Sequence, residues 1–435
     1  MIIGEVVDIN IEKVCIYASD VCRKRSLDAS KIRDYLTKNK YEVIYNLKDA
    51  DTIIFVTCGV ADRATESSLK KVEEFQQYEA ELIVAGCLPA IEKEKLSKIF
   101  NGKTIITKDL DNLDRFFPEN KVRIKDVDDA NHLYDYIYDD MLYSGVRRIL
   151  TKLRLLSWVD KTYLDVRNYV LRDWIGEQSP LYEVLTKDHY HIRVSWGCLG
   201  NCAYCGIKKA IGTHKSKPLD QCVQEFKKGL KQGYKHFIIT SDDVGAYGSD
   251  ISSSFSELLD KLTRISGDYK IFVTDLHPMW VVKYIDGLEE IIKRGKIDIL
   301  NIPLQSGCAR VLKLMNRYSD VDKMKKAILR LKNAYPSLSL LSQNIGGFPT
   351  EKEDEFKETL RFIKEVDFDG GLIYPFSCKT GTEAEKIEPK IPQKEIINRL
   401  KYAKKYMRSS GYTVTYRSLI TSPKLYRCLL FMKYN

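Results

Sequence analysis

The sequence predicts an α/β fold in two units: a doubly wound parallel sheet, then a partial (β/α)6 barrel. Apolar, strand-like runs alternate with amphipathic helical stretches in two blocks, one over about residues 10–110 and one from His191 onward. Such alternation is typical of parallel sheets covered by helices. The 435 residues are 44% apolar, which suffices for two or three globular units with their own cores.

The first block predicts an N-terminal α/β domain over residues 1–118. Its apolar runs alternate with helical periodicity, so each strand is followed by a helix that returns the chain to the same edge of the sheet. The expected strands are 14–18, 41–44, 52–56 and 82–85, and the expected helices are 29–38, 64–77 and 90–99.

Residues 119–187 differ in composition from both blocks. The segment is rich in Tyr, with acids such as Asp126 and Asp128 first and bases such as Arg147 and Arg148 later. Its spacing indicates helices, and we interpret it as a linker or insertion.

The second block predicts a barrel over residues 188–398. Its expected strands are 192–195, 237–240, 271–274, 299–303, 338–345 and 372–376. In such architectures, chemistry gathers where loops leave the C-terminal ends of the strands.

The segment 399–435 is predicted to be a basic C-terminal tail. From Ile396 to Asn435 the sequence contains no Asp or Glu and nine bases, Arg399, Lys401, Lys404, Lys405, Arg408, Arg417, Lys424, Arg427 and Lys433. Together with a net charge of +10, this is compatible with a polyanionic partner, although solvated surface charge is the commoner explanation.

The N-terminus and the cysteine content bear on location. The first eight residues have no basic start and no apolar run, and no stretch approaches 18 apolar residues, so we expect a soluble cytoplasmic protein without a membrane partner. Eleven cysteines in a reducing compartment indicate metal binding or catalysis rather than disulfides.

Three cysteines follow the first expected barrel strand closely, at Cys198, Cys202 and Cys205 (the barrel trio). Thiolates select iron–sulfur clusters or zinc. Zinc sites usually add a second Cys pair or histidines, and none follows at suitable spacing, so a cluster is favoured. Three local ligands leave one iron of a cubane open for a small molecule.

Polar residues and glycines follow three of the expected barrel strands. Ser241 and Asp243 come after 237–240, Gln305 after 299–303, and Gly346 and Gly347 at the end of 338–345. The polar groups are suited to holding a ligand's ammonium or ribose, and the glycines to close approach of a nucleoside. Each is equally explained by the caps and turns of a barrel.

A second set of cysteines, Cys22, Cys58 and Cys87 (the N-terminal trio), is dispersed in sequence. Each stands at or near the end of an expected strand, and such ends converge on one edge of a parallel sheet. Cysteine is also a common core residue, so spacing alone favours packing. Cys15, Cys222, Cys308, Cys378 and Cys428 lack such a context, and we expect them to be packing residues.

The barrel trio resembles the hallmark of the radical S-adenosylmethionine (SAM) superfamily, Cys-x3-Cys-x2-Cys. The surrounding sequence is similar to that of the methylthiotransferases in this superfamily, specifically the archaeal and eukaryotic branch that acts on threonylcarbamoyladenosine in tRNA. The matching blocks span roughly residues 190–400 and are Trp196–Cys205, Lys208–Gly212, Ser216–Pro218, Asp243–Gly248, Pro303–Gly307, Val311–Arg317, Gly347–Glu351 and Gly381–Ala384.

This resemblance implies a [4Fe–4S] cluster on the barrel trio that binds and cleaves SAM, giving a 5′-deoxyadenosyl radical. It places Tyr204 near the adenine, although loop packing explains Tyr204 nearly as well. It also implies a second [4Fe–4S] cluster on the N-terminal trio, whose open iron holds the sulfur to be transferred. One SAM would methylate that sulfur, and a second would supply the radical that activates the acceptor carbon.

The N-terminal motif resembles the family's in Ala50–Cys58, Gly86–Cys87 and a Cys-x5-Asp frame from Cys22 to Asp28. It departs from the family in three positions. The family's glycine before the first cysteine is Val21, its asparagine three residues after that cysteine is Arg25, and its asparagine before Thr-Cys is Val56. These changes are expected to alter hydrogen bonding to the cluster.

The implied acceptor is C2 of N6-threonylcarbamoyladenosine near a tRNA anticodon, with an electron donor such as ferredoxin or flavodoxin. About twenty-five residues follow Gly411, too few for the small C-terminal β-barrel with which the family grips its substrate. Methylthiolation of a protein or peptide side chain therefore stays open. So does a catalytically inactive iron–sulfur relative, against which the two intact trios argue.

Overall fold

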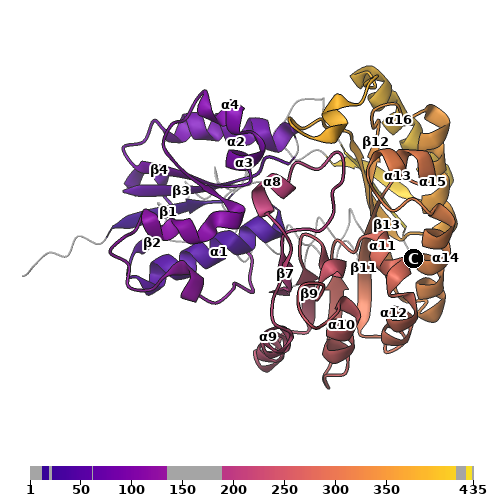
Figure 1. Cartoon of the computed structure of the whole chain (residues 1–435), viewed down its shortest axis with the longest axis horizontal. Helices are drawn as coiled ribbons and strands as arrows, with labels where there is room; N and C mark the ends of the chain where they lie inside the picture. The colour runs from indigo at the N-terminus through magenta and orange to yellow at the C-terminus, as the bar shows by residue number, and fades with distance from the viewer. Residues whose placement is uncertain (1–11, 19–21, 61, 135–188, 418–427, 434–435) are drawn as a thin grey trace, which may run out of the picture. The chain divides into compact units, whose positions relative to one another are not determined.

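The computed structural model describes residues 12–18, 22–60, 62–134, 189–417 and 428–433. The chain forms two compact units, one of Met1–Tyr136 with Lys209–Ile211 and one of Ile137–Lys208 with Gly212–Asn435. Figure 1 colours the first mainly indigo to purple and the second magenta to yellow. Each unit is described by itself.

The first unit contains a five-stranded sheet in the order β2-β1-β3-β4-β5, with every neighbouring pair parallel. The first strand, β1, lies inside the sheet, and later strands are added on both sides of it, which is a doubly wound topology. The strands are β1 (Lys13–Tyr17), β2 (Glu42–Ile44), β3 (Thr52–Thr57), β4 (Glu81–Gly86) and β5 (Lys103–Ile106). The four expected strands are confirmed, and β5 is an addition that the sequence analysis missed.

Both faces of this sheet are buried, because successive strand residues point to opposite sides. Ile54 and Val56 of β3 join a core with α1, whereas Ile53 and Phe55 join a separate core with α2. The helices are α1 (Arg23–Lys38), α2 (Asp62–Phe75), α3 (Leu88–Ile91) and α4 (Lys93–Ser97), with 3-10 turns η1 (Leu47–Asp49), η2 (Thr107–Arg115) and η3 (Ile124–Asp126). One expected helix, 90–99, is thus two short helices.

The second unit contains an eight-stranded sheet in the order β14-β15-β13-β12-β11-β10-β9-β6. The strands from β6 to β13 in this order are parallel, and β15 and β14 pair antiparallel at one edge. They are β6 (Tyr190–Arg193), β9 (His236–Thr240), β10 (Lys270–Val273), β11 (Ile297–Gln305), β12 (Ser339–Gly346), β13 (Gly370–Pro375), β14 (Thr413–Arg417) and β15 (Cys428–Met432). The six expected barrel strands are confirmed.

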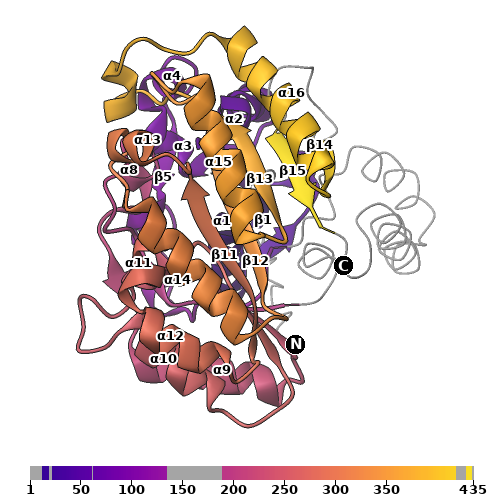
Figure 2. The same cartoon turned by 90° about the vertical axis from the view of Figure 1, so that its right-hand side faces the viewer.

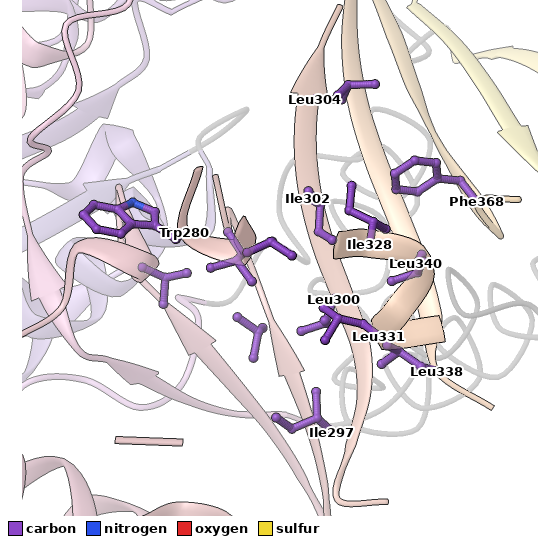
Figure 3. Packing of buried hydrophobic residues seen from close by; sticks show 14 of the residues in the cluster. Trp280, Ile297, Leu300, Ile302, Leu304, Ile328, Leu331, Leu338, Leu340 and Phe368 are labelled. Atoms are coloured by element: carbon purple, nitrogen blue, oxygen red, sulfur yellow. The ribbon is translucent and has the colours of Figure 1, made fainter. Parts of the chain in front are cut away.

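Helices cover the outside of this curved sheet, and Figure 2 shows α14, α15 and α16 in front of its strands. One large core joins strands to helices; Figure 3 shows Leu300 and Ile302 of β11 beside Ile328 and Leu331 of α14. The remaining elements are β7 (Ser195–Trp196), α8 (Lys208–Ile211), β8 (Lys215–Ser216), α9 (Leu219–Lys231), η4 (Val244–Ala246), α10 (Phe255–Thr263), α11 (Pro278–Lys283), α12 (Ile285–Ile292), α13 (Ala309–Leu314), α14 (Val321–Ala334), α15 (Glu353–Val366), η5 (Glu383–Lys386) and α16 (Gln393–Ser409).

The C-terminal segment is more ordered than the expected tail. Helix α16 runs across the predicted boundary at 398/399, and β14 and β15 extend the sheet beyond the six expected strands. Of the expected linker, only residues 119–134 are described, and 135–187 lie outside the described residues. Within the described ranges, no helix is long and apolar enough to cross a membrane.

Candidate iron–sulfur sites

The barrel trio lies on a loop after β6 and β7, and each of its thiols is partly buried. Gly197 enters this loop with φ +71°, and a Cβ there would lie 2.0 Å from the Thr213 carbonyl oxygen, so only glycine fits. The Gly200 N–H donates to Cys198 Sγ over 3.1 Å. Burial raises the pKa of Cys198 to about 12 and that of Cys205 to about 11. A cationic partner is therefore needed to hold these groups as thiolates.

Ser241 and Asp243 lie at the C-terminal end of β9, as expected, but protein groups already engage them. Ser241 Oγ lies 2.5 Å from Ser195 Oγ, and Asp243 Oδ1 accepts a hydrogen bond from Trp280 Nε1 over 2.8 Å. Asp243 Oδ2 accepts from the Cys198 thiol over 3.7 Å, and burial raises the Asp243 pKa. Asp243 therefore touches the barrel trio directly, while contact of either residue with a cofactor stays a prediction.

Tyr204 and Arg317 form a polar contact beside the barrel trio. Arg317 Nη1 lies 3.3 Å from Tyr204 Oη and 3.5 Å from Cys202 Sγ, and Nη2 donates to the Pro303 carbonyl over 2.5 Å. Arg317 Nε is buried and has no hydrogen-bond partner among the described residues. Arg317 ends the block Val311–Arg317 that resembles the family, and no role was expected for it from the sequence. No local signal set Arg317 apart from Lys313, the other base of the same block.

His277 is a second residue at this edge that the sequence analysis did not single out. Burial lowers its pKa to about 2, and the positive charge of Arg317 acts in the same direction. The imidazole is therefore neutral, and its Nδ1 accepts the Met279 N–H over 3.0 Å at the start of α11. Gln305 ends β11 with φ +72°, an uncommon conformation for a residue other than glycine that often marks functional sites.

Gly346 ends β12 and Gly347 follows it, and their surroundings explain why they are glycines. A Cβ on Gly346 would lie 2.8 Å from the Phe356 ring, and one on Gly347, where φ is +85°, would lie 2.5 Å from Ile396. Close approach of α15 and α16 is thus sufficient to explain both glycines, whether or not a nucleoside also approaches them. A cofactor contact through their backbone stays a prediction.

The N-terminal trio is brought together within the first unit by three element ends. Cys22 precedes α1, Cys58 follows β3, and Cys87 follows β4. Burial raises the pKa of Cys58 to about 12, and Cys22 and Cys87 each add to this rise electrostatically. Cys58 and Cys87 directly follow Thr57 and Gly86, which are paired in register between β3 and β4. Gly86, with φ +103°, places Cys87; a Cβ there would lie 2.5 Å from the Thr57 carbonyl oxygen.

A cluster and a single metal ion place different geometric demands on the two trios. Among the described residues, no three His, Cys, Asp or Glu side chains converge closely enough to hold one ion. A tetrahedral zinc draws its sulfurs to about 2.3 Å from one centre, whereas a cubane spreads them over separate irons. The remaining cysteines agree with packing at Cys15, Cys222 and Cys308, which are buried. The expectation was wrong for Cys378, which is exposed, and Cys428 is only partly buried.

Comparison with known proteins gives two family matches, one over the barrel region and one over the N-terminal region. Residues 192–363 match the model of the radical SAM superfamily, and residues 17–107 match that of the uncharacterized protein family UPF0004. The fold and the barrel trio therefore define a radical SAM protein. The chain is similar to the methylthiotransferases of that superfamily, enzymes that use SAM and two [4Fe–4S] clusters.

The curated relatives differ in acceptor. A probable threonylcarbamoyladenosine tRNA methylthiotransferase of Methanocaldococcus jannaschii is 28% identical, over 90% of this chain and 83% of the relative. A ribosomal protein uS12 methylthiotransferase of Thermotoga sp. is 26% identical, over 86% of this chain and 79% of the relative. A solved radical SAM methyltransferase, TsrM of Kitasatospora setae, has a TM-score of 0.56 at 9% identity, over 97% of this chain and 86% of that one. The last comparison concerns the fold alone.

Proposed function

We propose that the protein replaces C–H by C–SCH3 at C2 of N6-threonylcarbamoyladenosine near a tRNA anticodon. The barrel trio would hold the cluster that binds SAM, and the N-terminal trio the auxiliary cluster. The observation that carries the proposal is that each unit of the chain gathers three cysteines at strand or helix ends. Relatives named as tRNA methylthiotransferases support the choice of acceptor. With tRNA as the acceptor, we expect a cytoplasmic enzyme.

When bound, SAM and the clusters supply the radical and the methylthio group. The chain's own residues position and shield them. The Gly200 N–H bonds to Cys198 Sγ, and the Arg317 guanidinium lies against Cys202 Sγ and offsets the negative charge of thiolates in this half-buried loop. The hydrogen bond from Trp280 holds the Asp243 carboxylate in place beside Cys198.

A surface suited to tRNA lies on α16. Lys401 and Lys405 are exposed one turn apart, and between them the ring of Tyr402 is 39% exposed and stacks on Tyr406 with centroids 6.2 Å apart. Lysines neutralise phosphates, and aromatic faces stack on unpaired bases, so such a surface fits a structured RNA with loops.

Not every base of this stretch is available for RNA. Arg399 is 5% exposed and pairs with Glu351 and Glu395, Lys433 pairs with Asp367, and Arg408 Nη2 donates to the Val414 carbonyl. On α16, the basic surface available to RNA is therefore smaller than the sequence predicts, and it lies around Lys401 and Lys405.

The test supplies the anaerobically reconstituted enzyme with SAM, a reductant and tRNA that carries N6-threonylcarbamoyladenosine. Nucleosides are then analysed by mass spectrometry, and the expected product is the 2-methylthio derivative. If 5′-deoxyadenosine forms without a methylthio nucleoside, tRNA is not the acceptor. A parallel reaction with ribosomal protein uS12 then tests a protein side chain.

A further inference from the structure

Arg25 is buried in the first unit in a way that its sequence position does not explain. It lies in the first turn of α1, three residues after Cys22, and only 2% of it is exposed. Arginine is seldom fully buried unless its charge is paired. The contacts of Arg25 therefore indicate why its side chain is buried.

The guanidinium lies between a carboxylate and a cysteine. Its Nε is 3.0 Å from Asp28 Oδ2, one turn along α1, and its Nη1 donates to Cys87 Sγ over 3.9 Å, 62 residues away in the sequence. Asp28 is itself 7% exposed, so this ion pair is little screened by water. Asp28 holds one edge of the guanidinium and directs another toward the sulfur.

Cys87 also meets a second polar group. Thr107 Oγ1 at the start of η2 lies 3.7 Å from the same sulfur. Burial raises the pKa of both Cys58 and Cys87, and in both the positive charge of Arg25 opposes that rise. The charge of Arg25 thus acts on two of the three thiols of the N-terminal trio.

We propose that Arg25 is a positioning residue of the auxiliary cluster, which raises that cluster's reduction potential by donating to Cys87 and placing a fixed positive charge beside it. Reduction adds a negative charge to the cluster, and a nearby cation in a buried site stabilises the reduced form more than the oxidised form. A hydrogen bond to a ligating sulfur acts in the same direction, because it withdraws electron density from the cluster. The inference rests on the proposed assignment of the N-terminal trio as ligands.

The test isolates the auxiliary cluster in the full chain. The three cysteines of the barrel trio are replaced by Ala, and the protein is reconstituted with iron and sulfide without oxygen. Reduction is followed by electron paramagnetic resonance in a potentiometric titration. At a fixed potential, Arg25→Asn should lower the ratio of reduced to oxidised cluster about tenfold, which is ~59 mV for one electron. Arg25→Lys, which retains the charge, should shift the ratio less.

A matched control lies on the same helix. Arg33 is partly exposed and pairs with Asp34, and Arg33→Asn should leave the potential unchanged. An Arg25→Asn protein with full iron and an unchanged potential overturns the inference. If Arg25→Asn binds no iron, Arg25→Lys decides: iron at a near-original potential supports a role for the charge. If both variants lose iron, Arg25 is needed to fold the site and the inference about the potential is overturned.

Failure of the ligand assignment gives a different result. If the protein with Arg25 intact and the barrel trio replaced binds no iron, the N-terminal trio does not hold a cluster. The proposed ligand set is then wrong, and the role of Arg25 falls with it. Iron content of this parent protein therefore separates the two failures before any potential is measured.

Discussion

Arg399 lies in the acid-free C-terminal stretch, yet its guanidinium serves the fold. Nη1 lies 2.8 Å from Glu351 Oε2 and Nη2 donates to the Glu351 carbonyl over 2.8 Å, and the two side chains are 5% and 0% exposed. Arg399→Met leaves a buried carboxylate without its cation. Breaking such a pair costs about 3–5 kcal/mol of unfolding free energy.

The cost should depend on pH with a sign set by Glu351. Burial raises its pKa from 4.5 to about 7, and the Gly347 N–H and Arg399 oppose that rise. The folded state therefore holds this proton more tightly than the unfolded state, and stability falls as pH rises from 4.5 to about 7. Without Arg399 the folded pKa is higher still, so the fall continues above pH 7 at up to about 1.4 kcal/mol per pH unit.

Urea unfolding of the reconstituted enzyme and its Arg399→Met variant, without oxygen, measures this effect. The loss of stability should be about 1 kcal/mol larger at pH 8 than at pH 6. Adding Glu351→Gln should recover part of it, because an amide can still accept the Gly347 N–H without burying a charge. A loss independent of pH, or a double variant no more stable than Arg399→Met, would refute the reasoning.

Three further outcomes are expected. Replacing the barrel trio by Ala should abolish 5′-deoxyadenosine formation, whereas replacing the N-terminal trio should leave SAM cleavage and end sulfur insertion; a methylthio product from the latter variant contradicts the assignment. Lys401→Glu with Lys405→Glu should weaken tRNA binding and flatten its log–log salt dependence by roughly 1.4–1.8, measured by filter binding. The equally spaced and exposed pair Lys227 and Lys231 on α9 is the matched control, and an equal effect there argues against the α16 surface. Gly347→Ala should cost about 2–4 kcal/mol in urea unfolding, and Ile396→Ala should recover part; a loss of SAM affinity without a loss of stability would favour a ligand contact instead.

Figures 1 and 2 place α9 and α16 at different ends of the second unit. Charge reversal on α9 therefore changes the net charge as much as reversal on α16 does, without touching the proposed surface. This makes the pair a control for long-range electrostatics as well as for folding.

Local signals in the sequence were enough to determine the α/β architecture. Apolar runs that alternate with amphipathic helical stretches predicted four strands of the first unit and all six parallel strands of the second. The close spacing of Cys198, Cys202 and Cys205 defined one loop, because so short a segment cannot separate its ends. Strand β15, which lies between β14 and β13, pairs with β13 across more than fifty residues, and no local pattern predicted that pairing.

Tertiary structure alone decided which side chains meet. The contact of Arg25 with Cys87, that of Arg317 with Cys202, and the pairing of Arg399 with Glu351 join residues 62, 115 and 48 positions apart. Nothing in a local sequence pattern distinguishes a buried, paired arginine from a solvated one, since the difference lies in which elements pack around it. The sequence determined the strands, the positions of the two cysteine trios and the surplus of bases. Packing decided which of these bases are buried in ion pairs, as Arg399 is, and which stay exposed, as Lys401 and Lys405 do.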